Sequence, residues 1–229
     1  MKKLWAYHVI LVAITVFASC KNEPASSNTD ASGKEKEKTE EIVKARTFIV
    51  KYKTTVNYKD VINESISTQW IDVENDKVAI ETESEIKMMG KKMKNRDLTI
   101  IKNNETWLIN LIDKSAYKAG KSKLLDQNQS EFIKADSDES FRQKVEASGG
   151  KIVGNESVLG KNCIVIELPD SSGKSEMKSK MWYYQGIPLK MSNSYYNMEA
   201  VEIQENVDIP AEKFEVPAGI KIKDMQGMK

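Results

Sequence analysis

The sequence predicts a mainly β protein of the α+β class, in which an antiparallel sheet is interrupted by a helical insertion. From residue 46 onward apolar and polar residues alternate, and the alternating runs are joined by short polar breaks. Between residues 124 and 150 a helical spacing replaces this alternation. Successive runs of strand length with short breaks are typical of an antiparallel meander. Several runs exceed the average strand length, so we expect long strands and a strongly curved sheet.

The first β section contains five predicted strands. They are the runs "RTFIVKYKTTVNYK", "SISTQWIDVEN", "KVAIETESEIKM", "KNRDLTIIKN" and "TWLINLIDK", separated by breaks such as "ENDK", "MGKK" and "KNNE". In the third run Val78 and Ile80 share one side with Ile86 and Met88. In the fifth run Ile109 and Leu111 fall on the same side as Trp107, and we take that side as the inward surface.

The helical insertion is "LLDQNQSEFIKADSDESFRQKVEASGG", residues 124–150. Its apolar residues are spaced as in one or two helices, and Gly149-Gly150 provides a stop; these residues are Leu124, Leu125, Phe132, Ile133, Phe141 and Val145. A second β section follows over residues 151–169, 178–197 and 198–210. The final "FEVPAGIKIKDM" contains two turn residues, Pro217 and Gly219, which favours a docked segment over a regular strand.

The N-terminus has the pattern of a bacterial secretory signal over residues 1–19. Lys2 and Lys3 precede an apolar run that ends at Phe17, and the small pair Ala18-Ser19 stands before Cys20. The run is shorter than the roughly 20 residues that cross a bilayer. Cys20 matches the lipobox cysteine of bacterial lipoproteins, so we expect it to be the site of lipid attachment. Two or three acyl chains on one residue would give a lasting membrane anchor.

Residues 20–45 follow the predicted lipidation site and are almost free of apolar side chains. Such a stretch cannot bury enough surface to offset its ordering entropy, so we expect a flexible tether before a single domain over residues 46–229. The beginning "CKNE" resembles the acidic signals that direct some lipoproteins to the outer face of the outer membrane. We therefore expect an outer membrane lipoprotein that faces the periplasm or the surface.

Composition argues against several classes of function. Once the signal is removed, 33 basic residues stand against 34 acidic ones, and this balance lacks the basic footprint of a nucleic-acid-binding protein. The single histidine, His8, lies in the signal, so the mature chain has no imidazole for a catalytic triad or a histidine metal site. We expect a non-enzymatic protein without a cofactor or metal. Cys163 has no disulfide partner once Cys20 is lipidated, and we place it in the core.

Four phrases carry a resemblance to a known family. They are "TWLINLIDKSAYKAG", "ESVLGKNCIVIEL", "KMWYYQGIPLKM" and "DIPAEKFEVPAGIKIKDM". In this order they resemble the lipoprotein-carrier superfamily of LolA and LolB, and more closely its uncharacterised secreted relatives. The resemblance spans residues 46 to 229. It implies a strongly curved antiparallel sheet forming an unclosed barrel, helices that cover the concave face, and an apolar cavity for acyl chains. The carriers' arginine is not assigned to any arginine of this sequence.

The candidate ligand-binding residues lie on the predicted inward faces: Trp70, Ile80, Trp107, Ile109, Leu111 and Trp182. The same side chains could instead fill the core. The methionines, of which Met88, Met89 and Met93 cluster, are adaptable packing residues or, alternatively, Cu(I) ligands. The aromatic residues between Trp182 and Tyr196 form hairpin pairs or, alternatively, a carbohydrate platform.

The sequence thus leaves two hypotheses of function. In the first, the protein is attached to the membrane through N-terminal acyl chains, and it binds or carries lipid, acylated protein or another apolar ligand in a concave cavity. In the second, the same sheet is a surface or periplasmic scaffold for an unidentified protein partner, and its own side chains fill the cavity.

Overall fold

Twelve strands make up most of the fold in a computed structural model, which describes residues 46–103, 105–119, 138–168 and 179–223. These residues belong to one compact unit, Ala45–Lys229. The first six strands are β1 (Thr47–Tyr58), β2 (Val61–Asp72), β3 (Lys77–Met88), β4 (Lys91–Lys102), β5 (Glu105–Asn110) and β6 (Ser115–Ala119). The others are β7 (Lys151–Val158), β8 (Lys161–Leu168), β9 (Ser179–Tyr184), β10 (Ile187–Ser192), β11 (Tyr196–Glu205) and β12 (Lys221–Lys223).

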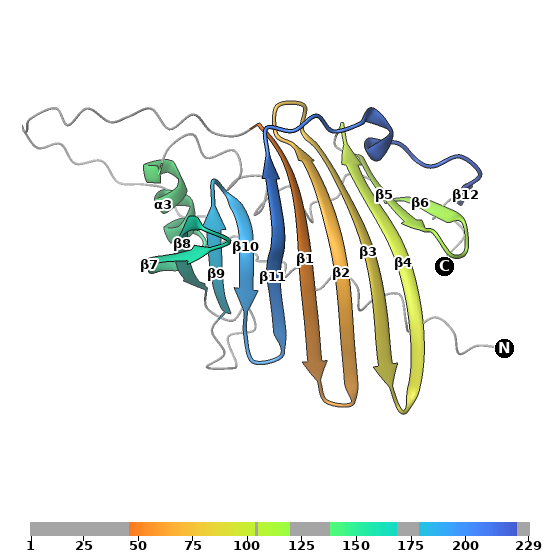
Figure 1. The fold of residues 1–229 in the computed structure, drawn as a ribbon, viewed down its shortest axis with the longest axis horizontal. Helices are drawn as coiled ribbons and strands as arrows, with labels where there is room; N and C mark the ends of the chain where they lie inside the picture. Colours follow the sequence, from red (N-terminus) through yellow and green to blue (C-terminus); the bar gives the residue numbers. More distant parts are fainter. Residues whose placement is uncertain (1–45, 104, 120–137, 169–178, 224–229) are drawn as a thin grey trace, which may run out of the picture. The chain divides into compact units, whose positions relative to one another are not determined.

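All twelve strands belong to one unclosed sheet (Figure 1). Their order is β12-β6-β5-β4-β3-β2-β1-β11-β10-β9-β8-β7, so that the second β section joins the first through β11 and β1. Every pairing is antiparallel except that of β12 with β6, which is parallel. The mainly β, antiparallel and unclosed sheet predicted from the sequence is therefore confirmed.

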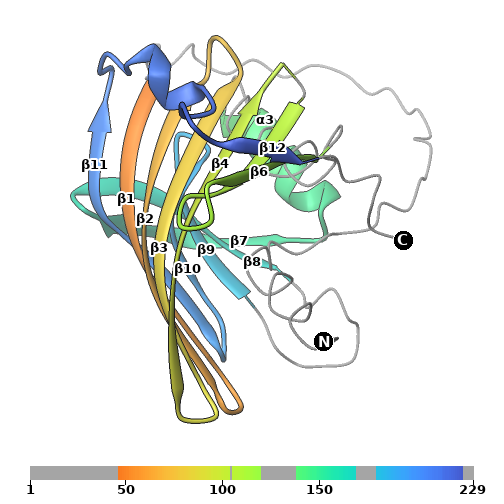
Figure 2. The ribbon, with the colours of Figure 1, turned by 90° about the vertical axis from the view of Figure 1, so that its right-hand side faces the viewer.

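Tight turns between long strands fix the register of the first β section. Strands β1 to β4 have 12 residues each, which gives a length of about 40 Å at roughly 3.3 Å per residue. The β3–β4 turn contains only Met89 and Gly90, both with positive φ. Two-residue turns of this kind match the twist of the strands that they join. Figure 2 shows that β1 to β4 follow a common bend.

A buried apolar cluster, here called the inner cluster, lies on one face of the sheet. It contains Phe48, Val50, Tyr52, Ile71, Val158, Cys163, Val165, Trp182, Ile187, Leu189, Met198 and Ala200. Strands β1 and β8 are four places apart in the sheet, yet they share this cluster. We take this face as the concave inner face, because the cluster joins Val50 of β1 to Val165 of β8 and the sheet is bent. Cys163 is fully buried, as predicted, and burial raises the pKa of its thiol.

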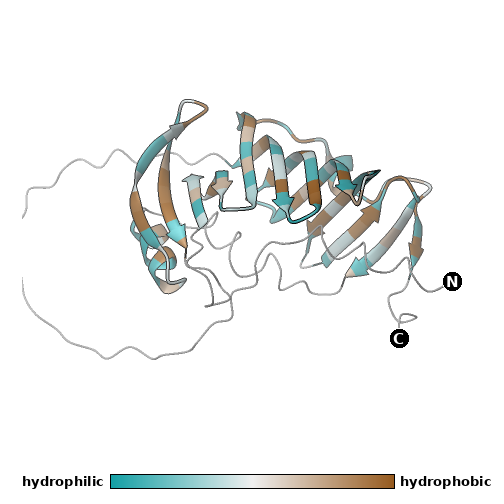
Figure 3. Cartoon of the chain, turned by 90° about the horizontal axis from the view of Figure 1, so that it is seen from below, coloured by the Kyte–Doolittle hydropathy of each residue, from teal (hydrophilic) through white to brown (hydrophobic). Residues whose placement is uncertain are grey.

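The opposite, outer face carries a second cluster, here called the outer cluster. Its buried members are Trp70, Ala79, Leu98, Ile100, Ile109, Ala116 and Phe214. Phe214 ends the 3-10 helix η2 (Ala211–Phe214), which lies on β3 and β4. Figure 3 shows the alternation of hydrophilic and hydrophobic residues along the strands that separates the two faces.

The C-terminal end differs from the prediction. We predicted a docked segment in place of a strand, and residues 209–220 do dock on the outer cluster. The chain then continues into β12, which extends the sheet beyond β6. The sequence reason for the error is that a three-residue strand is too short to show an alternating pattern.

One α-helix, α3 (Asp138–Ala147), is present in the described residues, and its position corrects the prediction that helices cover the concave face. Its Phe141 and Val145 pack against Ile166 and Leu168 of β8. Cys163 and Val165 of β8 point to the inner cluster, and alternate residues of a strand point to opposite faces. Helix α3 therefore lies on the outer face. Leu124, Leu125, Phe132 and Ile133 of the predicted insertion lie outside the described residues.

The C-terminal end of α3 generates a test of this packing. A Cβ atom added to Gly150 would lie 2.7 Å from Leu168 Cδ2 and 3.1 Å from the carbonyl oxygen of Val145. We expect Gly150→Ala to lower the free energy of unfolding by about 1–3 kcal/mol, because the added methyl group overpacks the contact between α3 and β8. Denaturant unfolding measures the change, and the exposed neighbour Lys151→Ala should stay within about 0.5 kcal/mol of the parent. An equal loss in both variants would contradict the packing described.

Candidate functional site

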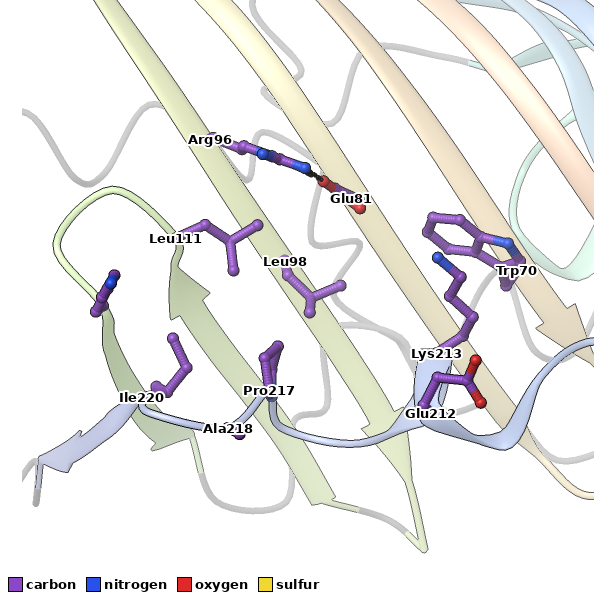
Figure 4. Close-up of a pocket in the computed structure, with 11 residues that line it drawn as sticks. Trp70, Glu81, Arg96, Leu98, Leu111, Glu212, Lys213, Pro217, Ala218 and Ile220 are labelled. Atoms are coloured by element: carbon purple, nitrogen blue, oxygen red, sulfur yellow. Dashed lines mark hydrogen bonds and ion pairs between the residues drawn. The ribbon is translucent and has the colours of Figure 1, made fainter.

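A half-open pocket of about 390 Å³ lies on the outer face, between the sheet and the C-terminal segment (Figure 4). The strands contribute Trp70 from β2, Glu81 from β3, and Arg96 and Leu98 from β4, with Leu111 and Lys114 beyond β5. The C-terminal segment contributes Glu212, Lys213, Pro217, Ala218 and Ile220. Its volume lies within the range of roughly 300–1,000 Å³ that is usual for small-molecule sites.

The pocket exists because the C-terminal segment is held at two points. At one point Phe214 is buried in the outer cluster beside η2. At the other, the backbone N–H of Lys221 donates to the carbonyl of Lys114 over 2.9 Å, where β12 begins. Between these points Pro217 and Ala218 line the pocket together with Leu98 and Leu111 (Figure 4).

The lining of the pocket combines six apolar side chains with five charged ones. Arg96 donates from Nε and Nη2 to Glu81 Oε1 over 2.8 and 2.5 Å, and this pairing raises the pKa of the Arg96 guanidinium. Lys213 places its Nζ atom 4.5 Å from the centre of the Trp70 ring. A cation at this distance from an indole face is attracted to it. The lining thus combines one compensated pair, Arg96 with Glu81, with the further charges of Lys114, Glu212 and Lys213.

Of the six candidate ligand-binding residues, the structure brings four together in the outer cluster. Trp70 and Ile109 are buried there, Trp107 and Leu111 pack against them, and Trp70 and Leu111 also line the pocket. We had taken the side of Trp107, Ile109 and Leu111 as the inward surface, whereas it lies on the outer face. Alternation shows which residues share a face, but the curvature that makes a face concave arises from contacts distant in sequence.

The other two candidates lie on the inner face. Ile80 is half-buried opposite Gln69 and Thr99. Trp182 belongs to the inner cluster, and its indole N–H donates to Glu156 over 2.7 Å. This buried and hydrogen-bonded position has the character of a core residue. The lipid-attachment residue, Cys20, lies outside the described residues.

Sequence reasoning missed most of the pocket. Arg96, Leu98, Lys213 and Ala218 line the pocket, and no pattern in the sequence assigns them a role. The turn residues Pro217 and Gly219 did indicate a docked segment, but they do not indicate which face it covers. In the described ranges, no group of three His, Cys, Asp or Glu side chains could hold a metal ion. No helix within those ranges has the length and apolar character needed to span a bilayer.

Comparison with known proteins finds distant structural likenesses only. No protein-family model matches the chain, and no curated protein is significantly similar in sequence. An uncharacterized conserved protein from Thermus thermophilus superposes with a TM-score of 0.46 and 8% identity, over 79% of this chain and 91% of that one. LprF from Mycobacterium bovis gives a TM-score of 0.36 and 7% identity, over 72% and 87%.

PNGF-II is a third structure of this kind, with a TM-score of 0.36 and 14% identity over 79% of this chain. The match covers 31% of PNGF-II, so the present chain spans about a third of that protein. Likenesses this distant carry no conclusion about the activity of the chain.

The anchoring of the C-terminal segment can be tested at Phe214, which is 2% exposed. We expect Phe214→Ala to lower the free energy of unfolding by about 3–5 kcal/mol, because it removes a buried aromatic ring and leaves a cavity. Denaturant unfolding measures the loss. Glu212→Ala, at an exposed position two residues earlier, is the control and should change stability by about 0.5 kcal/mol or less. If the two variants unfold alike, Phe214 does not anchor the segment.

Proposed function

We propose that the chain is a lipid-anchored, non-enzymatic binding protein of the bacterial envelope, related to the LolA and LolB carriers. In this proposal Cys20 carries the acyl anchor, and the protein faces the periplasm or the surface from the outer membrane. Its ligand is an acyl chain or another apolar molecule with an anionic end. The observation that carries the proposal is the outer-face pocket, whose lining joins apolar side chains to three cationic and two anionic ones.

The apolar side chains of the lining suit an alkyl chain. Leu98, Leu111, Ile220 and the Trp70 ring offer an apolar surface that requires no polar group of the ligand. Burial contributes about 0.8 kcal/mol per methylene, so eight buried methylenes would supply roughly 6 kcal/mol before the cost of ordering the ligand. This location differs from the concave cavity that the family resemblance implies, because the inner cluster occupies that side of β8 to β11.

The lysines of the lining suit an anionic end group. Glu81 already compensates Arg96, whereas the two lysines Lys213 and Lys114 share the rest of the lining with a single carboxylate, Glu212. A carboxylate or phosphate at the mouth of the pocket would gain charge-assisted hydrogen bonds from these ammonium groups. The alkyl chain would then extend over Leu98 and Leu111.

A second function, the scaffold for a protein partner, is favoured by one observation. The inner cluster is filled by the protein's own side chains, and each of its twelve buried members is at most 9% exposed. A filled interior was the structural feature that this hypothesis required. Recovery of a stoichiometric protein partner from an envelope extract, without any bound lipid, would favour it over the binding protein.

Filling the pocket tests the first proposal. We expect Ala218→Trp to weaken binding of a fluorescent fatty acid by about tenfold or more, which corresponds to roughly 1.4 kcal/mol, because the indole would occupy the space beside Leu98 and Leu111. The measurement is a fluorescence titration of residues 20–229 carrying Cys20→Ser, which needs no detergent. Ala211→Trp places the same bulk at an exposed position outside the pocket and should leave the affinity unchanged. Equal affinity in both variants would exclude this pocket as the acyl site.

The anchor is tested separately. We expect Cys20→Ser to move the protein from the membrane pellet to the soluble fraction of a bacterial host and to remove acyl mass from the purified chain, because the lipid-bearing sulfur is lost. Fractionation and intact-mass measurement report the two effects. Cys163→Ser removes a thiol from the core instead and should stay in the pellet. A Cys20→Ser chain that remains membrane-bound after alkaline extraction would refute lipid anchoring at this residue.

A further inference from the structure

The inner face changes from apolar to polar along the length of the long strands. The register places Phe48, Ile71, Val78 and Ile101 side by side in one row across β1 to β4. Four residues further along β1, on the same face, lies a row in which every side chain can form hydrogen bonds. This row runs across six strands through Tyr52, Ser67, Thr82, Asp97, Asn110 and Ser115.

The next row continues the polar character. It contains Thr54, Ser65, Ser84 and Asn95, and Asn63 follows in the row beyond. We call these two rows together with Asn63 the polar band. The polar band has one carboxyl group, that of Asp97, and the band contains no lysine or arginine.

The outer face of the same strands has a different character. There Glu81, Glu83 and Glu85 of β3 face Arg96 and Lys92 of β4 in ion pairs. Charged residues paired in this way are ordinary for an exposed sheet surface. The band on the inner face is instead built of neutral hydroxyl and amide groups, which both donate and accept hydrogen bonds.

Three side chains of the polar band are buried and lack hydrogen-bond partners. The Tyr52 hydroxyl, Asn63 Oδ1 and Ser84 Oγ make no hydrogen bond with any described residue, although the three residues are 0%, 8% and 6% exposed. Buried polar atoms are nearly always satisfied in folded proteins, so a group of unsatisfied ones indicates an absent partner. Asn63 and Ser84 are diagonal neighbours on adjacent strands. The Cα atoms of diagonal neighbours are typically about 7–8 Å apart. Such spacing matches a ligand with several hydroxyl groups.

Other side chains of the polar band are held in place by hydrogen bonds to one another. Asn110 Nδ2 donates to Asn95 Oδ1 over 3.0 Å and to Asp97 Oδ1 over 3.3 Å, and Asn95 donates to Asp97. Thr82, Asn95 and Asn110 are only half-buried, so the polar band can be reached from solvent. Fixed side chains that are both polar and accessible reduce the ordering cost of binding.

We propose that the polar band is a second binding site, which takes an uncharged, hydroxyl-rich ligand such as a short segment of a neutral glycan. The Ser84 hydroxyl and the Asn63 amide oxygen bond directly to sugar hydroxyls, and Asp97 accepts from others. A phosphorylated ligand is disfavoured because the band offers no cation. The site lies on the face opposite the acyl pocket, so it does not depend on the function proposed above.

The test uses the full chain in a detergent without sugar groups, lauryldimethylamine oxide, with chitotetraose, maltotetraose and cellotetraose as probes. Saturation-transfer NMR and titration calorimetry should detect binding of at least one probe. We expect Ser84→Ala to weaken that binding by about three- to tenfold, the effect of one lost hydrogen bond. Thr55→Ala, on the outer face of β1, is the matched control and should bind as the parent does.

A stability measurement on the same variants separates a binding role from a structural one. Ser84→Ala and Tyr52→Phe each remove a buried hydroxyl that has no described partner, so their melting temperatures should stay the same or rise. A hydroxyl with a structural partner would give a lower melting temperature instead. The proposal is overturned if none of the three probes binds, if Ser84→Ala binds as tightly as the parent, or if Ser84→Ala is clearly destabilised.

Discussion

The fold depends on the curling of a long, unclosed sheet around its apolar inner face. Strands β1 and β8 are four places apart, and Val50 and Tyr52 share one buried cluster with Cys163 and Val165. A twelve-stranded sheet that remained flat would leave this apolar face in water, at a cost of about 1.5–3 kcal/mol for each large side chain. Among the residues that the structure describes, curling buries it without a second sheet or a covering helix. The outer face is then left available for α3 and for the C-terminal segment.

This curling of the sheet explains why its two faces differ in amino-acid composition. Where the curl brings strands together, the inner face is apolar and filled by its own side chains. Further along β2 to β4 the same face carries serine, threonine and asparagine, which form no apolar core. The outer face of β3 and β4 carries paired charges, whereas Phe214 with its neighbours and helix α3 each cover an apolar part of that face.

The sequence predicted local structure well because strands and turns depend on neighbouring residues. The run from Lys77 to Met88 coincides with β3, and the turn at Met89 and Gly90 lies where a polar break was expected. β6 was missed because its five residues, "SAYKA", show no clear alternation. The face of each strand was harder to predict, since the curvature of the sheet depends on packing among residues distant in sequence, such as those that β1 and β8 contribute to one buried cluster. For the same reason the alternation in β5 did not show that Trp107 and Ile109 pack with Phe214 of the C-terminal segment.

The candidate sites could be predicted only in part, for a related reason. Each site combines residues that are far apart in sequence, as when Lys213 lies over Trp70 and Ala218 lines the same pocket as Leu98. The polar band is different, because alternating serines and threonines in β2 and β3 are visible in the sequence. Such residues are usually taken as the exposed side of a strand. The strand register shows that these serines and threonines lie on the same face of the sheet as the inner cluster. The low exposed fractions of Ser84 and Asn63 show that both side chains are shielded from water. A polar side chain buried on the concave side of a curled sheet has therefore lost its hydrogen bonds to water. The group that replaces the water affects stability, and where that group belongs to a ligand it also determines function.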